Sequence, residues 1–343
     1  MLLKIFSSAL ELIGVVDDYA SVKIEKNFRG IPNVKIKAKL SDNIRAMLRP
    51  GNVIFAEDAD ESFVIDYVSY DNEGTESRSA HVTAMGKGVL SMLSRRAVRY
   101  RLLHIGGLGQ LMQSIVNGAS SAMPGSVVCD IAEISKSVII EQNYGDTCEV
   151  LCDLCRIFSV GMSMKFHPNT KSFTFRSLGE IDCSTDQTQY PPIIYSRERE
   201  NVISEFYVND ASALKTTAYI YGSENGQGSR YSTTAGDTSS PDRREIVIFA
   251  NDLSIRRYES NGATDVASYI AALKRRGEET LATLKETKSH HVTITPTATP
   301  IPPLGTICTI LNQDWNIKSK ATITKEQSIT QNGKTEKTIT LSS

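Results

Sequence analysis

Residues 331–334 read QNGK and lie between two runs in which apolar and polar residues alternate. Asn-Gly favours the two-residue turn of a β-hairpin, because both residues tolerate a positive φ. The same alternation appears in residues 34–40, VKIKAKL, where apolar residues alternate with lysines. A period of two places every second side chain on one face of a strand. These patterns predict a β-rich chain whose strands bury one face and expose the other to solvent.

The first hundred residues hold further strand patterns, at 52–56, 62–70 and 79–86. Short helices are expected at 41–52, capped by Ser41 or Asp42, and near 88–95. Five or six short strands with one small helix are typical of a small barrel or sandwich. We therefore expect an N-terminal β domain over residues 1–100.

Helical patterns are more frequent after residue 100. Helices are expected at 108–122 and 147–160, before a hairpin that turns at Pro168-Asn169. Residues 222–242 are rich in Gly, Ser and Thr and nearly lack apolar residues, which is typical of a flexible loop. We divide the chain into an α+β domain over 101–180, strands over 181–222, a flexible loop over 223–243, and a C-terminal helix with a β-hairpin region over 244–343.

Gly277 lies inside the charged amphipathic helix expected at 268–285, which runs directly into a strand. Glycine in a helix costs about 1 kcal/mol relative to alanine. Either Gly277 permits close packing against another backbone, or it is tolerated on a solvated helix.

The composition is that of an ordinary globular protein, with 40% hydrophobic and 22% charged residues. A net charge of −1 gives the whole chain no strong field for nucleic acid or an anionic membrane. No run approaches 18 apolar residues, so no membrane insertion is expected. Residues 1–24 carry Lys4 as their early positive charge, and Ser7, Ser8 and Glu11 interrupt the apolar run, which favours a strand of the mature protein over a signal peptide.

Three of the six cysteines lie in TCEVLCDLC, at the spacing i, i+4, i+7. This spacing places Cys148, Cys152 and Cys155 on one helix face with Leu151. A zinc site would need a fourth ligand and usually a tight CxxC turn, so a buried stripe of small hydrophobic residues is favoured. The scattered Cys129, Cys183 and Cys308 indicate reduced core thiols rather than a disulfide framework.

No catalytic motif for nucleophilic, metal-dependent or nucleotide chemistry is present. The glycines of GGLG, at 106–109, lack the spacing of a phosphate loop. His290-His291 would point to opposite faces of a strand and so cannot share a metal, and His167 is expected to be an exposed turn residue. We expect no cofactor, no metal and no enzymatic activity, although a site assembled in space from scattered Ser, Asp and Glu stays open.

Charge is unevenly distributed in the first domain. Residues 51–77 contain eight acidic residues and no Lys or Arg, whereas 78–101 contain six basic residues and no acidic one. The two runs are either two differently solvated faces, or one face lines something that must not bind an anion while the other docks a neighbour.

A series of phrases spans residues 12–341. The chain opens with LELIGVVDDYASVKIEKNFRGIPNVKIKAKL, continues with MLRPGNVIFA and VTAMGKGVLSMLSRRAV, then FTFRSLGEIDCSTDQTQYPPIIYSRERENVISEFYVND and AYIYG, and closes with YIAALKRRGEETLATLK, SHHVTI and PPLGTICTI. In this order they resemble the tail hub proteins at the tail tip of long-tailed bacteriophages, a family similar to the baseplate hub of contractile tails. One departure is Gly305-Thr306, where the family usually has an acidic residue after the LG.

The resemblance implies a β-rich α+β fold, a multidomain hub with two tube-protein-like β-barrel or sandwich domains and small α/β insert domains. Residues 1–100 would form the first tube-like domain, and 181–222 would return to the ring. The protein would be a structural component of a phage or prophage-derived tail. It would form a homotrimeric ring at the distal end of the tail tube and adapt the sixfold tube to a threefold tip.

The implied partners are the tail tube or distal tail protein, the tape measure protein and a spike or fibre protein. DNA would pass through without specific binding. The implied location is the tail tip of the virion, after assembly in the bacterial host cytoplasm. Two alternatives are a tail-associated cell-wall hydrolase, since some hubs carry one, and a host-surface carbohydrate-binding module, which 7% aromatic residues with a single Trp315 do not favour.

Within this hypothesis the acidic run from Glu57 to Glu76 is the candidate channel-facing surface. Its densest part holds four carboxylates, Glu57, Asp58, Asp60 and Glu61. Repulsion of phosphates would let DNA pass without adhering.

Overall fold

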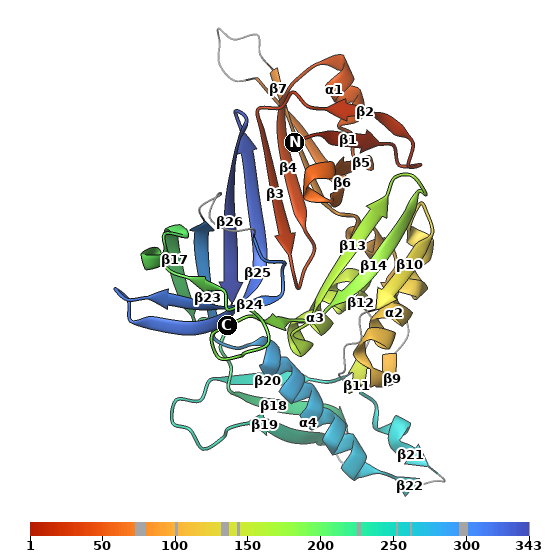
Figure 1. Cartoon of the computed structure of the whole chain (residues 1–343). Coiled ribbons are helices and arrows are strands. Elements are labelled where there is room, and N and C mark those ends of the chain that lie inside the picture. Colours follow the sequence, from red (N-terminus) through yellow and green to blue (C-terminus); the bar gives the residue numbers. More distant parts are fainter. Residues whose placement is uncertain are drawn as a thin grey trace. The chain divides into compact units, whose positions relative to one another are not determined.

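The computed structural model describes residues 1–72, 80–99, 102–131, 137–142, 145–224, 228–251, 253–260, 263–294 and 301–342. It divides into two compact units, one formed by Met1–Tyr207 with Ser289–Ser343 and the other by Val208–Lys288. The second unit is therefore one insertion in the sequence of the first (Figure 1).

A large, mainly antiparallel sheet dominates the first unit (Figure 1). Its described strands follow the order β17-β23-β26-β25-β3-β4-β7-β6-β5-β1-β2, and β24 pairs with β25, β15 and β16. Their bounds are β1 (Leu3–Phe6), β2 (Leu12–Val16), β3 (Ser21–Asn27), β4 (Asn33–Lys39), β5 (Val53–Ala56), β6 (Glu61–Asn72), β7 (Ala80–Gly88), β15 (Ile181–Asp182), β16 (Ile194–Tyr195), β17 (Val202–Asp210), β23 (Thr287–Ile294), β24 (Thr306–Asn312), β25 (Ile317–Gln331) and β26 (Lys334–Ser342).

Two hydrophobic cores lie against different parts of this sheet. One contains Val22, Ile24, Val34 and Ile36, the apolar positions of the alternating strands β3 and β4. The other contains residues of β24, β25 and β26, including Ile310. The expected β-rich α+β fold is thus confirmed as a large antiparallel sheet with smaller mixed sheets, whereas its division into two tube-like domains stays a prediction.

The long strand β25 joins two parts of the large sheet. Its first part, from Ile317 to Thr322, pairs with β24. Its second part, from Lys325 to Gln331, pairs with β3, and β26 lies along its other side. The turn between β25 and β26 is the expected Asn-Gly hairpin, with φ of 52° at Asn332 and 72° at Gly333. Both positive values suit the twist of the flanking strands.

Helices, a small sheet and side chains of β1, β5 and β6 build a third core in the same unit. The helix expected near 88–95 is a 3₁₀ helix, and the helix expected at 108–122 ends in one. The elements are η2 (Val89–Arg95), β8 (Ala97–Val98), β9 (Leu102–Gly107), α2 (Leu108–Ala119), η3 (Ser120–Ala122), β10 (Val127–Ile131), β11 (Ser137–Gln142), β12 (Gly145–Asp146), α3 (Thr147–Phe158), β13 (Gly161–His167) and β14 (Ser172–Leu178); α1 (Asp42–Met47), η1 (Glu57–Ala59) and η4 (Arg197–Arg199) lie elsewhere in the unit.

The cysteine stripe on α3 is confirmed as core packing. Cys148, Leu151 and Cys155 are buried, and Cys152 is half-buried. Burial raises the pKa of Cys152 to about 11, so this thiol stays protonated and unreactive near neutral pH. Asp146 caps the helix by accepting from the backbone N–H of Cys148 at 2.9 Å.

The second unit packs one helix on one face of a three-stranded sheet. It contains β18 (Thr217–Glu224), β19 (Arg230–Gly236), β20 (Glu245–Phe249), η5 (Ile255–Tyr258), β21 (Glu259–Ser260), β22 (Ala263–Thr264) and α4 (Val266–Thr283). Part of the loop expected over 223–243 is instead the strand β19, paired with β18. The segment is mainly polar, but two of its residues face the core of the unit: Ala235 is buried, and the Tyr231 ring lies 5.6 Å from that of Tyr269.

Gly277 is buried where α4 meets this sheet. A Cβ at this position would lie 2.4 Å from Cδ1 of Ile220 and 2.9 Å from Cβ of Ala235. The close approach is therefore real, but Gly277 faces side chains of its own unit rather than another backbone.

Candidate functional site

The acidic turn, residues 57–61, joins β5 to β6 and consists mainly of the 3₁₀ helix η1. Glu57 pairs with Lys4 at 2.8 Å, and Asp58 lies 3.6 Å from the N-terminal amine. Asp60 pairs with Lys165 of β13 at 2.5 Å. These three carboxylates are exposed, but each has a cationic neighbour. The turn therefore has a weaker negative field than its sequence alone suggests.

Glu61, the fourth candidate residue, is not freely exposed. It begins β6 and is half-buried. Burial raises its pKa to about 7, and the charge of Asp60 acts in the same direction, while Lys26 opposes the shift. Glu61 is thus partly protonated near neutral pH and adds little permanent charge to the turn.

Replacing Glu61 by glutamine is expected to stabilise the protein at alkaline pH. A carboxyl whose pKa rises on folding, from about 4.5 to about 7, makes its full contribution to stability below about pH 4.5 and loses it as pH rises through 7. This loss amounts to at most about 3 kcal/mol. The melting temperature of Glu61→Gln should be higher than that of the unmodified protein at pH 8 and little changed at pH 5. The melting temperature of Glu57→Gln should change little at either pH. Equal behaviour of the two variants would contradict a buried Glu61.

The rest of the acidic run divides between described and undescribed residues. Asp66 and Asp71 lie exposed on β6. Glu73 and Glu76, with the expected loop that holds them, lie outside the described residues. The structure thus brings together the four residues of the turn, but not the whole run.

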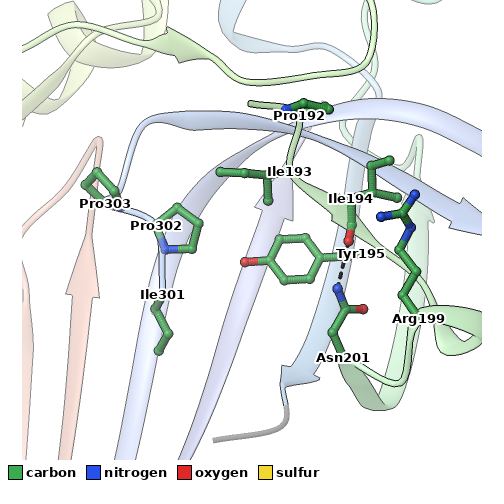
Figure 2. Close-up of a pocket in the computed structure, with 9 residues that line it drawn as sticks. All are labelled: Pro192, Ile193, Ile194, Tyr195, Arg199, Asn201, Ile301, Pro302 and Pro303. Carbon is green, nitrogen blue, oxygen red and sulfur yellow. Dashed lines mark hydrogen bonds between the residues drawn. The ribbon is translucent and has the colours of Figure 1, made fainter. Parts of the chain in front are cut away.

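A pocket of about 520 Å³ lies beside the edge strand β16 (Figure 2). Two proline-containing segments border it, and its lining is Pro192, Ile193, Ile194, Tyr195, Arg199, Asn201, Ile301, Pro302 and Pro303. The Asn201 side chain holds the wall by donating to the Ile194 carbonyl at 2.8 Å and accepting from the Ser196 N–H at 3.0 Å. The lining supplies apolar surface and the Arg199 cation but no carboxylate, thiol or imidazole, so it suits binding rather than acid–base chemistry.

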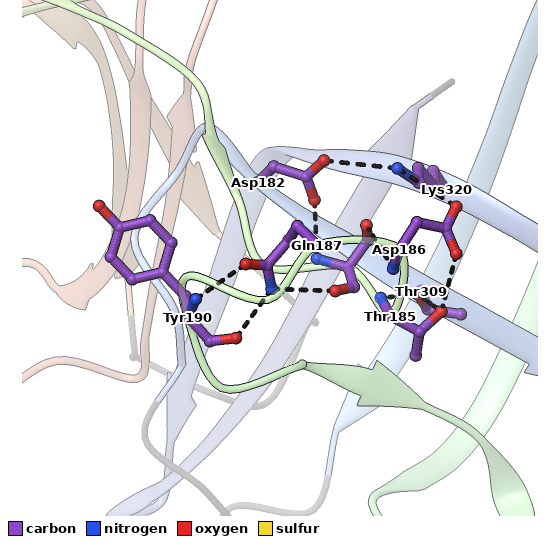
Figure 3. A network of polar contacts seen from close by, with 8 residues as sticks. Asp182, Thr185, Asp186, Gln187, Tyr190, Thr309 and Lys320 are labelled. Atoms are coloured by element: carbon purple, nitrogen blue, oxygen red, sulfur yellow. Dashed lines mark hydrogen bonds and ion pairs between the residues drawn. The ribbon is translucent and has the colours of Figure 1, made fainter.

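The loop between β15 and β16 is fixed by a polar network (Figure 3). Lys320 of β25 lies 3.4 Å from Asp182 and 3.2 Å from Asp186. Hydrogen bonds from Ser184 lower the pKa of Asp182, with Lys320 assisting. Gln187 bonds twice to the backbone of Tyr190, at 2.8 Å each. The loop that leads to the pocket is thus bonded to β25 through Lys320 and internally through Gln187.

His290 and Glu205 form a buried hydrogen-bonded pair between β23 and β17. Their side chains are 2% and 4% exposed, and the His290 Nε2 lies 2.9 Å from the carboxylate. Asn312 also donates to Glu205, and Trp315 stacks on His290 at 5.9 Å. Burial lowers the pKa of His290, so the ring is neutral and donates from Nε2. The pair ties β17, an outermost strand, to the sheet.

Both outermost strands of the large sheet expose apolar side chains. Leu12, Ile13 and Val15 are exposed on β2, and Ile203 and Phe206 on β17. Phe206 is 65% exposed. We call these strands the β2 edge and the β17 edge. Each has a paired neighbour on one side and no described strand on the other. Unpaired strands with apolar side chains are templates for pairing with another chain.

No group of three or more His, Cys, Asp and Glu side chains is placed to hold a metal ion within the described ranges. His290 and His291 do project to opposite faces, since His290 bonds to Glu205 and His291 to Thr340 of β26. His167 is half-buried and bonds to Thr174 at 2.9 Å, rather than standing free in the turn. As far as the chain is described, none of its helices is both long and apolar enough to span a membrane.

Solved structures share this fold over nearly the whole chain. The tail protein of Neisseria meningitidis MC58 is 12% identical, with a TM-score of 0.59 over 99% of this chain and 96% of that one. The 43 kDa tail protein of prophage MuSo2 from Shewanella oneidensis is 9% identical, with a TM-score of 0.58 over 99% and 98%. The prophage tail protein gp18 of Listeria monocytogenes EGD-e is 13% identical, with a TM-score of 0.54 over 99% and 94%. No protein with curated annotation matches the sequence.

At these identities the likeness establishes the fold. The family assignment comes from the sequence itself, because the model of the Siphovirus ReqiPepy6 Gp37-like proteins matches residues 2–341. The match includes the whole series of phrases, and it confirms the resemblance to phage tail proteins. The chain belongs to the Siphovirus ReqiPepy6 Gp37-like protein family.

Proposed function

We propose that this protein is a non-enzymatic tail hub of a phage or prophage-derived tail. Three copies form a ring at the distal end of the tail tube, in the virion. The observation that carries the proposal is the pair of apolar edges on one sheet. The β2 edge and the β17 edge are different surfaces of the same subunit, so contact between them in successive copies is heterologous and closes a ring when the rotation fits.

Two hydrophobic cores on one sheet support the adaptation of symmetry. If each core marks one tube-like domain, three subunits present six such domains to a sixfold tube and three subunits to a threefold tip. The two cores are built from different strands, so the two proposed domains are not identical. Three copies of a subunit with two similar but non-identical domains have threefold symmetry and only approximate sixfold symmetry. This suits a component that faces a sixfold tube on one side and a threefold tip on the other.

The partners in this proposal are the tail tube or distal tail protein, the tape measure protein, and a spike or fibre protein. The pocket beside β16 is a rigid surface on which an apolar side chain of a partner fits. DNA passes through the ring without sequence-specific contact.

A separable part of the proposal is that Glu57, Asp58 and Asp60 face the channel. Lysine at Glu57 and Asp58 would reverse charge at exposed positions and leave Glu61 in place. Tails that carry both substitutions should assemble normally but eject their genome slowly. Ejection at the normal rate would contradict the channel-facing position of these carboxylates and leave the rest of the proposal untouched.

The ring is tested by the solution mass of the purified chain, measured by light scattering after size exclusion. A mass about three times the 37.7 kDa of one chain is expected. A monomer at every concentration would reject a ring that forms without its neighbours. Reconstitution with the tail tube protein would then decide whether the neighbour is required.

A further inference from the structure

The pocket beside β16 is lined by a buried tyrosine whose hydroxyl is open to a ligand. Tyr195 is 7% exposed, and within the described part of the chain its hydroxyl has no hydrogen-bond partner. Figure 2 shows the hydroxyl pointing across the pocket toward Ile301 and Pro302. Burial raises the pKa of Tyr195, so the group stays protonated and can donate. Because buried polar groups are normally hydrogen-bonded, this donor marks a place for an acceptor atom of a ligand.

A second side-chain donor of the lining is the guanidinium of Arg199. Arg199 is exposed at the end of η4, and Figure 2 shows it beside Ile194. It forms no ion pair with any residue that the structure describes. The same turn also holds Arg197, Glu198 and Glu200, so its charges sum to zero. Arg199 therefore attracts a single anionic group in contact with it, rather than a polyanion at a distance.

Three backbone carbonyls at the pocket are already engaged. The carbonyls of Ile193, Ile194 and Pro303 each accept a hydrogen bond from the protein, at 3.0, 2.8 and 2.7 Å. The lining has no carboxylate, and its three prolines have no N–H to donate. The pocket thus consists of apolar surface with two donor groups, those of Tyr195 and Arg199, and it fits a ligand that is apolar and carries acceptor atoms.

The walls are held in place by the protein itself. The Asn201 side chain bridges the Ile194 carbonyl and the Ser196 N–H. The Ser196 hydroxyl caps η4 by accepting from the Arg199 N–H at 3.3 Å. In the other wall, proline rings fix φ at about −65°. A site that is formed in advance loses less conformational freedom on binding, so a short ligand is enough to fill it.

We propose that this pocket binds the C-terminal residue of a partner protein, and that this residue has an apolar side chain. Its terminal carboxylate pairs with Arg199, and its side chain packs on the isoleucines and prolines of the lining. A peptide carbonyl just before it accepts from Tyr195. A carboxylate and an apolar side chain on one Cα match a pocket that is apolar and has an unpaired cation.

The size and chemistry of the pocket favour a chain end over other ligands. Ligand pockets measure about 300–1,000 Å³, and 520 Å³ lies within that range. Terminal carboxylates are often bound by backbone N–H groups, a role that proline-rich walls cannot take, so Arg199 supplies the charge here. The place of this contact in a tail rests on the proposed function, whereas the binding itself does not require a ring.

The test measures the fluorescence anisotropy of octapeptides that are labelled at the N-terminus and titrated with the full chain. The peptides consist of glycine and serine and end in leucine, isoleucine or phenylalanine. We expect at least one free acid to bind, and its C-terminal amide to bind about tenfold more weakly, because the charged hydrogen bond is lost. Arg199→Gln should make the two affinities equal. The control Arg197→Gln removes an exposed arginine of the same turn outside the lining and should keep the tenfold preference.

Tyr195→Phe separates a role in binding from a role in folding. The variant should bind the free acid and the amide about fivefold more weakly, because one neutral hydrogen bond is lost. Its melting temperature should not fall, since the hydroxyl has no partner among the described residues. A lower melting temperature with unchanged binding would show that the hydroxyl serves the fold and would overturn its role as a ligand donor.

Equal binding of acid and amide by the unmodified protein would overturn the proposal, as would an acid preference that survives in Arg199→Gln. An amidated peptide with an internal glutamate that binds as tightly as the free acid would overturn the assignment to a chain end. Absence of binding by all three peptides at millimolar protein would overturn it as well. A monomeric mass with intact peptide binding would reject the ring alone, and a trimer that binds no peptide would reject the pocket alone.

Discussion

Lysine at position 206 is expected to abolish the trimer and leave a folded monomer. Phe206 lies on the β17 edge and is 65% exposed in the single chain, so its replacement opens no cavity and removes only a ring contact with His291 at 6.2 Å. In the ring it would lie against the β2 edge of the next copy. Burying a phenylalanine contributes about 1.5–3 kcal/mol, and an unpaired charge placed in the same contact costs several kcal/mol. The proposed ring repeats this contact three times, so the penalty would apply three times and favour the monomer.

The mass of Phe206→Lys by light scattering checks this expectation, with circular dichroism to confirm folding. The matched control is Phe249→Lys, which changes an equally exposed phenylalanine on β20 of the other unit. The control should remain a trimer. If Phe206→Lys also kept the trimer mass, the β17 edge would not be the interface.

Leucine in place of His290 is expected to destabilise the larger unit by about 1–3 kcal/mol, because it leaves the buried Glu205 without its imidazole hydrogen-bond donor. Asn312 alone cannot satisfy both carboxylate oxygens. Since the pair ties β17 to β23, the same variant should lower the stability of the trimer. Urea unfolding at pH 7.5 measures the loss.

Two further variants separate the buried pair from a general effect of losing a histidine. His291→Leu, on the opposite face of the same strand, removes a 3.2 Å hydrogen bond with Thr340 and should cost about 1 kcal/mol. The double variant Glu205→Met with His290→Leu removes both partners of the hydrogen bond and should be more stable than His290→Leu alone. A double variant as unstable as the sum of its parts would show that the pair is not coupled.

The pH dependence of the buried histidine runs opposite to that of Glu61. Because burial lowers the pKa of His290, the unfolded chain binds more protons than the folded chain below about pH 6.5. Stability therefore falls as pH falls below that value. This slope should be clearest in Glu61→Gln and absent in His290→Leu.

Local features of the fold were predictable because their causes are local. The turn at Asn332-Gly333 depends on two residues that accept positive φ, and the cysteine stripe depends on helical spacing within one segment. The family resemblance also followed from sequence, because it rests on the order of many short phrases. Boundaries differed by a few residues, as in α4, which begins at Val266 rather than near 268.

Pairings between distant segments were not predictable. Lys165 and Lys4 neutralise much of the charge of the acidic turn, but no sequence pattern near residues 57–61 indicates that these lysines lie beside it. Glu205 was not connected to His290, which lies 85 positions away. The exposure of Phe206 depends on β17 being an outermost strand, which the sequence does not state.

The pairing of β25 with β3 also delays completion of the large sheet until the C-terminal part of the chain has been synthesised. Glu25 of β3 and Lys325 of β25 are bridged across 300 positions. While the intervening residues are being translated, β3 has β4 beside it but must wait for its other neighbour. Non-local pairings of this kind fold slowly and leave strands exposed to aggregation. Prematurely terminated chains therefore keep one side of β3 unpaired. We expect chaperones and proteases to recognise such chains before they are incorporated into a particle.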